Sequence, residues 1–212
     1  MSATEHRTPA TRIKICGVTS AEDARLAADL GAFAVGMIFW PRSPRHVSVE
    51  TASAIVAALP AGVESVGVFV DQAADEVRQV AQAVGLTTLQ LHGSENVHDY
   101  DEGRRLIKAV AIRDADDVEH ASALPSSVLV LLDAHDPVKR GGTGQTIDWT
   151  LAARVAAVRP VVLSGGLHAG NVVDAIRAVR PYAVDVSSGV EHAPGRKDPA
   201  RLRTLFAAVR EL

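Results

Sequence analysis

The feature that most constrains the fold is an alternation of short apolar runs with longer amphipathic segments. Between the runs, apolar residues return every three or four positions, as in helices that pack one face against a sheet. This order is typical of βα units around a parallel sheet. Eight runs rich in Val, Ile and Leu lie at residues 12–17, 34–40, 65–70, 88–92, 106–111, 128–133, 160–164 and 183–187.

Eight βα units in one chain can close into a barrel, which leaves no strand at an open edge. The segment "LSGGL" at 163–167 returns as "VSSGV" at 186–190, and this weak repeat favours a barrel. We therefore predict an α/β fold, a single-domain (β/α)8 TIM barrel over residues 11–212, after a loose tail at residues 1–10. A doubly wound open sheet is the alternative fold.

Composition and charge exclude several classes of protein. The 212 residues are 47% hydrophobic and contain no Pro/Gly/Ser-rich linker, so one substantial core is expected. A net charge of -3 with scattered Lys and Arg offers no basic surface for nucleic acid. A single cysteine rules out an intramolecular disulfide, and no secretory signal or membrane-length apolar run is present. We expect a cytoplasmic protein without a membrane partner.

Two glycine-containing turns follow the last two predicted strands, where this fold usually binds phosphate. In "SGG" (Ser164, Gly165, Gly166) and "SSG" (Ser187, Ser188, Gly189), exposed backbone N–H groups can approach an anion closely. Either segment alone would suggest only a tight turn, but the pair favours phosphate. The loop "KRGGTG" at 139–144 is either a lid that adds donors at Gly142 and Gly144 or an ordinary flexible loop.

Asp133 and Cys16 end two of the runs and are the candidate acid and base. Because alternate residues of a strand share a face, Asp133 should point into the barrel with Leu131, and Cys16 with Lys14. A carboxyl among apolar neighbours loses hydration, which suits it to hold and donate a proton, although it could instead cap the next loop. A thiol becomes a competent base once cationic or dipolar groups stabilise its thiolate.

The same alternation directs further polar residues into the barrel mouth. Gln90 and His92 would point inward at the fourth strand, either as hydrogen-bonded wall or as substrate contacts. Asp185 shares the inward face of the eighth strand with Ser187, and we interpret it as a residue that orients others.

The chain resembles phosphoribosylanthranilate isomerases, enzymes of tryptophan biosynthesis. The resemblance extends from residue 12 nearly to the C-terminus, and the order and spacing of its segments are specific. The matching segments are "KICGVT" (14–19), "PRSPRHVS" (41–48), "GVFV" (67–70), "LQLHG" (89–93), "LLDA" (131–134), "GGTG" (141–144), "LSGGL" (163–167), "VDVSSGVE" (184–191) and "PGRKD" (194–198).

The resemblance implies an Amadori rearrangement of N-(5-phosphoribosyl)anthranilate to 1-(2-carboxyphenylamino)-1-deoxyribulose 5-phosphate, without metal or cofactor. It assigns Asp133 as the general acid that protonates the furanose ring oxygen, and Cys16 as the general base that takes the proton from C2. Arg45 would bind the anthranilate carboxylate through its planar fork of donors. Whether the protein is a monomer or a homodimer stays open.

Other functions compete with this assignment. The related histidine-pathway isomerase, or a barrel that serves both pathways, would need an aspartate where this chain has Cys16. A Schiff-base aldolase would use Lys14 or Lys108, each in an apolar strand. A phosphosugar-binding barrel without catalysis would make Cys16 and Asp133 incidental.

Overall fold

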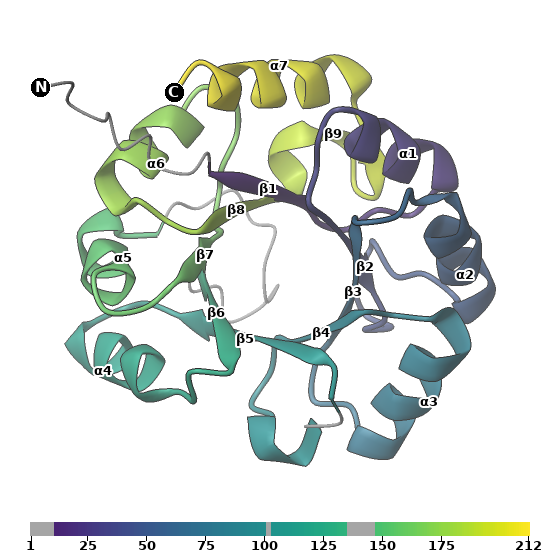
Figure 1. Ribbon diagram of the computed structural model, residues 1–212, viewed down its shortest axis with the longest axis horizontal. Helices are drawn as coiled ribbons and strands as arrows, with labels where there is room; N and C mark the ends of the chain where they lie inside the picture. Colours follow the sequence, from purple (N-terminus) through teal and green to yellow (C-terminus); the bar gives the residue numbers. More distant parts are fainter. Residues whose placement is uncertain (1–10, 101–102, 135–146) are drawn as a thin grey trace, which may run out of the picture.

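The computed structural model contains a closed barrel of eight parallel strands and describes residues 11–100, 103–134 and 147–212 (Figure 1). The strands pair in chain order, and β1 pairs with β8 to close the barrel. The predicted TIM barrel is confirmed, and the open sheet is wrong. The predicted tail at residues 1–10 lies outside the described residues. The strands are β1 (Arg12–Ile15), β2 (Ala34–Ile38), β3 (Glu64–Phe69), β4 (Thr88–Leu91), β5 (Arg105–Ala111), β6 (Val128–Asp133), β7 (Val161–Leu163) and β8 (Ala183–Val186).

Helices surround the barrel on its outside (Figure 1). Side-chain oxygens accept hydrogen bonds from first-turn N–H groups at several helix starts, for example at Ser20 and Ser48. The last helix starts with Asp198 as N-cap and with Pro199, whose fixed φ suits the first helical position. In the described ranges the α-helices are α1 (Ala21–Asp29), α2 (Val49–Ala58), α3 (Ala74–Val84), α4 (Ala115–Ala123), α5 (Trp149–Ala156), α6 (Val172–Val179) and α7 (Pro199–Arg210).

The prediction of eight βα pairs is wrong for the fourth unit. Between β4 and β5, the described residues form only the short 3-10 helix η1 (Val97–Tyr100). β4 ends at Leu91 and β5 begins at Arg105, and the sequence between them is short and mostly polar. So short a segment leaves too few residues for an amphipathic α-helix that could cover the sheet.

A small hairpin follows β8 that the apolar periodicity did not predict. It begins with the 3-10 helix η2 (Ser188–Val190) and pairs β9 (Glu191–Ala193) with β10 (Arg196–Lys197). The hairpin is too short and too polar to give a strand signal. It nevertheless brings two charged residues to the barrel mouth, as described below.

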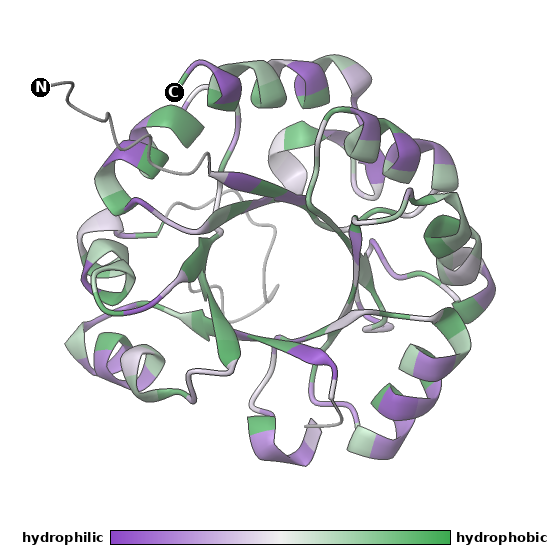
Figure 2. Cartoon of the chain, in the orientation of Figure 1, coloured by the Kyte–Doolittle hydropathy of each residue, from purple (hydrophilic) through white to green (hydrophobic). Residues whose placement is uncertain are grey.

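The apolar core has two layers. Outward-facing strand residues pack against the helices, and Figure 2 shows the apolar strands as a ring inside helices that carry the polar residues. A smaller layer fills the barrel interior, and its members come from β2, β3, β5, β6, β7 and β8: Ala34, Val66, Ile107, Leu131, Val162 and Ala183. The next inward positions toward the C-terminal strand ends therefore form the floor of any site at the mouth. Among the described helices, none combines the length and apolar character that crossing a bilayer needs.

Arg159 connects α5 to β7 at the opposite end of the barrel from the mouth, and its guanidinium binds backbone carbonyl groups there. It donates to the carbonyl oxygens of Ala121, Leu124, Pro125 and Val128 at 2.6–3.0 Å. We expect Arg159→Met to lower the free energy of unfolding by about 1–3 kcal/mol, because these carbonyl groups lose their donors. Urea unfolding measures the change, and enzymatic turnover at saturation should stay the same.

The matched control is Arg203→Met, since Arg203 is exposed and makes only a 3.3 Å hydrogen bond within its own helix. Equal losses of stability in the two variants would contradict the role given to Arg159.

Candidate active site

Polar residues meet at the barrel mouth in two groups, which contain several of the candidates predicted from the sequence. The first, the cysteine cluster, consists of Lys14, Cys16, Arg45, Asp185, Glu191 and Lys197. The second, the aspartate cluster, consists of Gln90, His92 and Asp133. β1 and β8, which position Lys14, Cys16 and Asp185, lie across the barrel from β4 and β6, which position the aspartate cluster (Figure 1). In the described ranges, no group of three or more His, Cys, Asp or Glu residues is placed to hold a metal ion.

Cys16 lies directly after β1 and points into the barrel, as its strand alternation predicted. Its residue is only 6% exposed, and its N–H donates to the Val186 carbonyl oxygen at 2.9 Å. Burial raises the pKa of the thiol, and the nearby ammonium groups of Lys14 and Lys197 lower it without reversing that direction. The unliganded site therefore holds Cys16 mainly as a thiol, and the cations beside it restrain the rise in its pKa.

Lys14 is fully buried beside Cys16 and forms an ion pair across the seam of the barrel. Its Nζ lies 2.8 Å from Oδ1 of Asp185, the residue opposite it in the β1–β8 register. Burial alone would lower the pKa of Lys14, but the Asp185 carboxylate and Cys16 outweigh it, and the pKa is raised. Lys14 is therefore an ammonium group, and the ion pair with Asp185 holds it in place.

Arg45 is connected to the backbone of Cys16 through two residues of the hairpin. Its Nε and Nη2 donate to the Glu191 carboxylate at 2.7–3.1 Å. Lys197 donates to Oε1 of Glu191 at 2.8 Å and to the Cys16 carbonyl oxygen at 2.6 Å. Burial would raise the pKa of Glu191, but the two cations outweigh it and the pKa is lowered. A buried, ionised Glu191 thus holds both the arginine and the strand end that carries the thiol.

Sequence reasoning did not single out Glu191 and Lys197 as site residues. They lie in "VDVSSGVE" and "PGRKD", two segments of the family resemblance, and this was the only signal that could have found them. Their position depends on a hairpin that carries no strand periodicity.

Asp133 ends β6, and its carboxylate is held by the other cluster. Its Oδ2 lies 3.2 Å from Nε2 of His92, and its Oδ1 accepts the N–H of Ala134 at 2.9 Å. Nε2 of Gln90 lies 3.0 Å from Nδ1 of His92. All three polar side chains point inward, as predicted, and Asp133 and Gln90 are almost completely buried. The chain of contacts orients the carboxyl toward the mouth.

The two predicted phosphate turns lie against each other. A side chain at Gly189 would clash with the Leu167 carbonyl oxygen, so the turn after β8 packs directly on the turn after β7. Gly165 and Gly166 have positive φ angles of 88° and 61°, and their N–H groups donate to no residue in the described part of the chain. Two adjacent turns with available amides have the geometry to accept an anion.

Ser187 and Ser188 lie in the turn after β8, whereas Gly142 and Gly144 lie outside the described residues. Ser164 and Ser188 are partly exposed beside the glycines, and the N–H of Ser164 is used in the β6–β7 ladder. The Ser187 hydroxyl is buried and has no hydrogen-bond partner among the described residues. A buried hydroxyl without a partner is costly, so a bound ligand is a natural partner for it.

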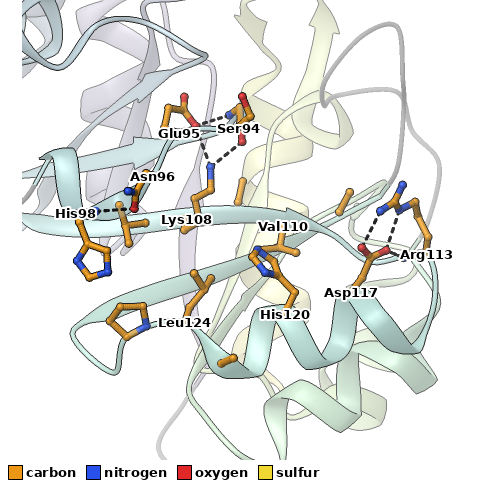
Figure 3. Close-up of a pocket in the computed structure, with 16 residues that line it drawn as sticks. Ser94, Glu95, Asn96, His98, Lys108, Val110, Arg113, Asp117, His120 and Leu124 are labelled. Atoms are coloured by element: carbon orange, nitrogen blue, oxygen red, sulfur yellow. Dashed lines mark hydrogen bonds and ion pairs between the residues drawn. The ribbon is translucent and has the colours of Figure 1, made fainter.

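A separate pocket of about 540 Å³ lies outside the barrel, between η1 and α4 (Figure 3). It occupies the region that a helix of the fourth unit would cover. Lys108 points into it from β5 and binds the Gly93 carbonyl oxygen at 2.6 Å and Glu95 at 2.9 Å. Neither Cys16 nor Asp133 borders this pocket, so it is distinct from the barrel mouth.

Replacing Glu191 tests the connection between Arg45 and Cys16. We expect Glu191→Gln to lower the free energy of unfolding by about 3–5 kcal/mol, because two buried cations lose their shared carboxylate. The substrate KM should also rise, since Arg45 loses the group that orients it. Denaturant unfolding and steady-state kinetics measure the two effects. Asp75→Asn is the matched control, because Asp75 forms an exposed ion pair, for which about 0–1 kcal/mol is expected.

The lowered pKa of Glu191 makes part of the stability depend on pH. A carboxyl whose folded pKa lies below its unfolded value of about 4.3 stabilises the fold above that value. This stabilisation is lost as the pH falls through the lower folded pKa. The stability difference between wild type and Glu191→Gln should therefore be constant above about pH 5 and shrink in more acidic solution. A difference that grows on acidification would contradict the ionised state of Glu191.

Comparisons with known proteins agree with this geometry. The model of a family described as "N-(5'phosphoribosyl)anthranilate (PRA) isomerase" matches residues 13–208. A curated relative from Pelobacter propionicus, named N-(5'-phosphoribosyl)anthranilate isomerase, is 45% identical over 94% of this chain and 96% of its own length. One from Pseudomonas fluorescens with the same name is 46% identical over 95% and 97%.

Solved structures of similar proteins share the fold. A phosphoribosyl anthranilate isomerase from Thermotoga maritima is 41% identical, with a TM-score of 0.88 over 95% of this chain and 100% of that one. Another isomerase of the same name, in complex with reduced 1-(o-carboxyphenylamino)-1-deoxyribulose 5-phosphate, is 39% identical, with a TM-score of 0.85 over the same shares.

Proposed function

The chain belongs to the N-(5'-phosphoribosyl)anthranilate isomerase family, and on this premise we propose that Cys16 and Asp133 are its catalytic base and acid. Membership makes the protein an isomerase of tryptophan biosynthesis. One observation carries the assignment of roles. A thiol and a carboxyl, both nearly buried, point inward from opposite sides of the mouth, next to the apolar layer that fills the barrel.

The two charged ends of the substrate have matching groups at the mouth. The turns at 164–166 and 187–189 would bind the phosphate through backbone N–H groups, with the unpartnered Ser187 hydroxyl beside them. Arg45 would bind the anthranilate carboxylate. Glu191 engages Nε and Nη2 of Arg45, and Nη1 makes no hydrogen bond to the described residues, so one side of the guanidinium can take a second carboxylate.

The reaction then needs one proton donor and one acceptor. Asp133 in its protonated form gives its proton to the furanose ring oxygen, the C1–O bond breaks, and an iminium forms between C1 and the anthranilate nitrogen. This iminium makes the C2 proton acidic. The Cys16 thiolate takes that proton, and the electron pair of the C2–H bond forms the C1–C2 double bond of an enolamine. General acid–base catalysis of this kind typically contributes about 10²–10⁴-fold per group.

The product and both residues are restored in the last step. The thiol formed on Cys16 returns its proton to C1, and the C2 hydroxyl loses its proton to the Asp133 carboxylate as the ketone forms. Every proton removed is thereby returned, and no oxidant or reductant is needed. The same two groups therefore complete the cycle.

His92 and Gln90 keep Asp133 oriented in both protonation states. When Asp133 is ionised, the Gln90 amide can donate to Nδ1 of His92, whose Nε2–H donates to the carboxylate. When Asp133 is protonated, the reverse polarity serves: Nδ1–H donates to the Gln90 carbonyl oxygen and Nε2 accepts from the carboxylic acid. Oε1 of Gln90 is buried without a partner in the described chain, so this exchange offers it one.

The geometry disfavours the alternative functions. A Schiff-base aldolase needs a neutral, accessible amine, but Lys14 is a fully buried ammonium group and Lys108 faces the outside of the barrel. The two-phosphate isomerase of histidine biosynthesis would have an aspartate in place of Cys16. A binding protein without catalysis would not need a buried carboxyl with a dedicated histidine partner.

A homodimer and a cytoplasmic location belong to the same proposal. One solved structure shows monomers generated from a dimeric phosphoribosylanthranilate isomerase of Thermotoga maritima, and the dimeric state of that parent enzyme supports the homodimer over the monomer. A biosynthetic enzyme must meet its phosphorylated substrate where that substrate is made, which supports the cytoplasm.

Turnover of freshly generated phosphoribosylanthranilate tests the assigned roles. The decay of anthranilate fluorescence measures this turnover. We expect Cys16→Ala and Asp133→Asn each to lower kcat by about 10²–10⁴-fold, because each removes one proton-transfer group. Circular dichroism should show that both variants stay folded. The control Ser122→Ala alters a helix hydroxyl on the outside of the barrel and should leave kcat unchanged.

Near-normal turnover in either folded variant would contradict the role given to that residue. No turnover by folded wild-type protein would contradict the proposed activity itself.

A further inference from the structure

Lys14 is the largest side chain with no exposed surface, and it lies inside the barrel rather than in the layer beneath the helices. Its neighbours Ile13 and Ile15 face the helices in the main core, so Lys14 and Cys16 share the inward face of β1. An ammonium group in such a place is costly unless it is paired. Its retention beside the single cysteine calls for a physical reason.

Lys14 contacts two groups in this interior. Nζ lies 2.8 Å from the Asp185 carboxylate. The ammonium also lies near the Cys16 thiol, because both groups border the same space beside Gly36 on β2. A Cβ atom at Gly36 would lie 2.9 Å from Sγ of Cys16 and 3.2 Å from Nζ of Lys14, so both atoms border the space that the missing side chain leaves free. The ammonium, the thiol and the carboxylate therefore form one buried group.

The charges around Cys16 come from β1, β8 and the hairpin. Lys14 faces it from its own strand and Asp185 from β8. Lys197 on β10 binds the Cys16 carbonyl oxygen, and Glu191 pairs with both Lys197 and Arg45. Gly36, the facing residue of β2, carries no charge. Among the described residues, Lys14 is the cation and Asp185 the anion that act most strongly on the thiol, and the two act on a thiolate in opposite directions.

We propose that Lys14 is a positioning residue of the isomerase, whose ammonium group stabilises the Cys16 thiolate, and that Asp185 limits this effect by holding the ammonium. The proposal rests on the proposed function, in which Cys16 must act as a thiolate to take the C2 proton. Lys14 exposes no surface at the mouth. It therefore acts through Cys16 and makes no contact with the substrate.

This arrangement opposes the cost that burial places on the Cys16 thiolate. Burial raises the pKa of Cys16, and the Lys14 ammonium opposes that rise. Without the ammonium, a thiolate in the barrel interior would face only the Asp185 carboxylate on this side. Without Asp185, the ammonium would have the thiolate as its nearest anion. The two single replacements should therefore move the thiol ionisation in opposite directions.

Alkylation of Cys16 measures this ionisation directly, because the chain contains no other cysteine. The experiment follows the rate of reaction with iodoacetamide as a function of pH, together with the ultraviolet absorbance of the thiolate, in wild type, Lys14→Met, Asp185→Asn and the double variant. Only the thiolate reacts at an appreciable rate. The free protein is used, so the result does not depend on substrate.

We expect the midpoint of the alkylation profile to move up by about one pH unit or more in Lys14→Met, which means about tenfold less thiolate at a given pH below it. In Asp185→Asn the midpoint should move down, and the double variant should lie between the two single variants. The kcat of Lys14→Met should fall by a similar factor, with KM changed by less than about twofold, because Lys14 does not touch the substrate.

The matched control is Lys108→Met, which breaks a buried lysine–carboxylate pair on the outside of the barrel, away from Cys16. It should lower stability and leave the alkylation midpoint unchanged. A purely structural role for Lys14 would make Lys14→Met and Lys108→Met behave alike, and this result would overturn the proposal.

An unchanged midpoint in folded Lys14→Met would also overturn it. If Lys14→Met does not fold, Asp185→Asn still decides, since a midpoint that stays in place or moves up contradicts the opposition between the two charges. Loss of the proposed function is distinguishable from these outcomes. Wild-type protein without turnover would refute the isomerase assignment, while the alkylation profiles would still report whether Lys14 controls the thiol.

Discussion

The pairing of β1 with β8 is the constraint on which the site depends. It places Lys14 opposite Asp185, which is 171 residues away in the sequence, at a distance of 2.8 Å. The same ladder continues to the N–H of Cys16, which donates to the Val186 carbonyl oxygen. If the first and last strands did not meet, a fully buried ammonium would have no counter-ion, and a buried charge without a partner costs several kcal/mol. Charge balance around the thiol therefore requires that the barrel closes.

The hairpin after β8 extends this dependence to substrate recognition. Glu191 is shared by Arg45 and Lys197, and Lys197 donates to the carbonyl oxygen of Cys16. The buried carboxylate of Glu191 thus holds Arg45, which is suited to the substrate carboxylate. Through Lys197 it also holds the strand end that carries Cys16, which is suited to the C2 proton. Because proton transfer depends on positions within a fraction of an ångström, a rigid connection of this kind is worth more to catalysis than to stability.

The barrel, the inward-facing residues and the strand ends could be predicted because they depend on local periodicity. Alternation along β6 was enough to direct Asp133 into the barrel with Leu131, and the residue is indeed nearly buried. The register between β1 and β8 could not be predicted, because nothing within either strand specifies which residue of the other it will face. The ion pair of Lys14 with Asp185 therefore stayed hidden, and Lys14 suggested instead an amine nucleophile.

Two other features escaped prediction for a related reason. The hairpin that carries Glu191 and Lys197 is too short for a period of two to be detectable, and its place is decided by contacts with Arg45 and the end of β1. The fourth unit has an apolar strand on each side, so a helix was expected between them by analogy with its neighbours. The segment between the two strands is too short and too polar to form that helix.

Three buried lysine–carboxylate pairs lie in the described part of the chain, and two of them, Lys108 with Glu95 and Lys14 with Asp185, have different consequences because their surroundings differ. Glu95 in the outer pair also accepts the N–H groups of Asp71 and Gly93, so the pair with Lys108 joins the loops after β3 and β4. Its charges are satisfied entirely by the fold. The inner pair of Lys14 and Asp185 borders a thiol whose charge can change. Chemically equal ion pairs thus differ in role because only one of them has an ionisable neighbour at the mouth of the barrel.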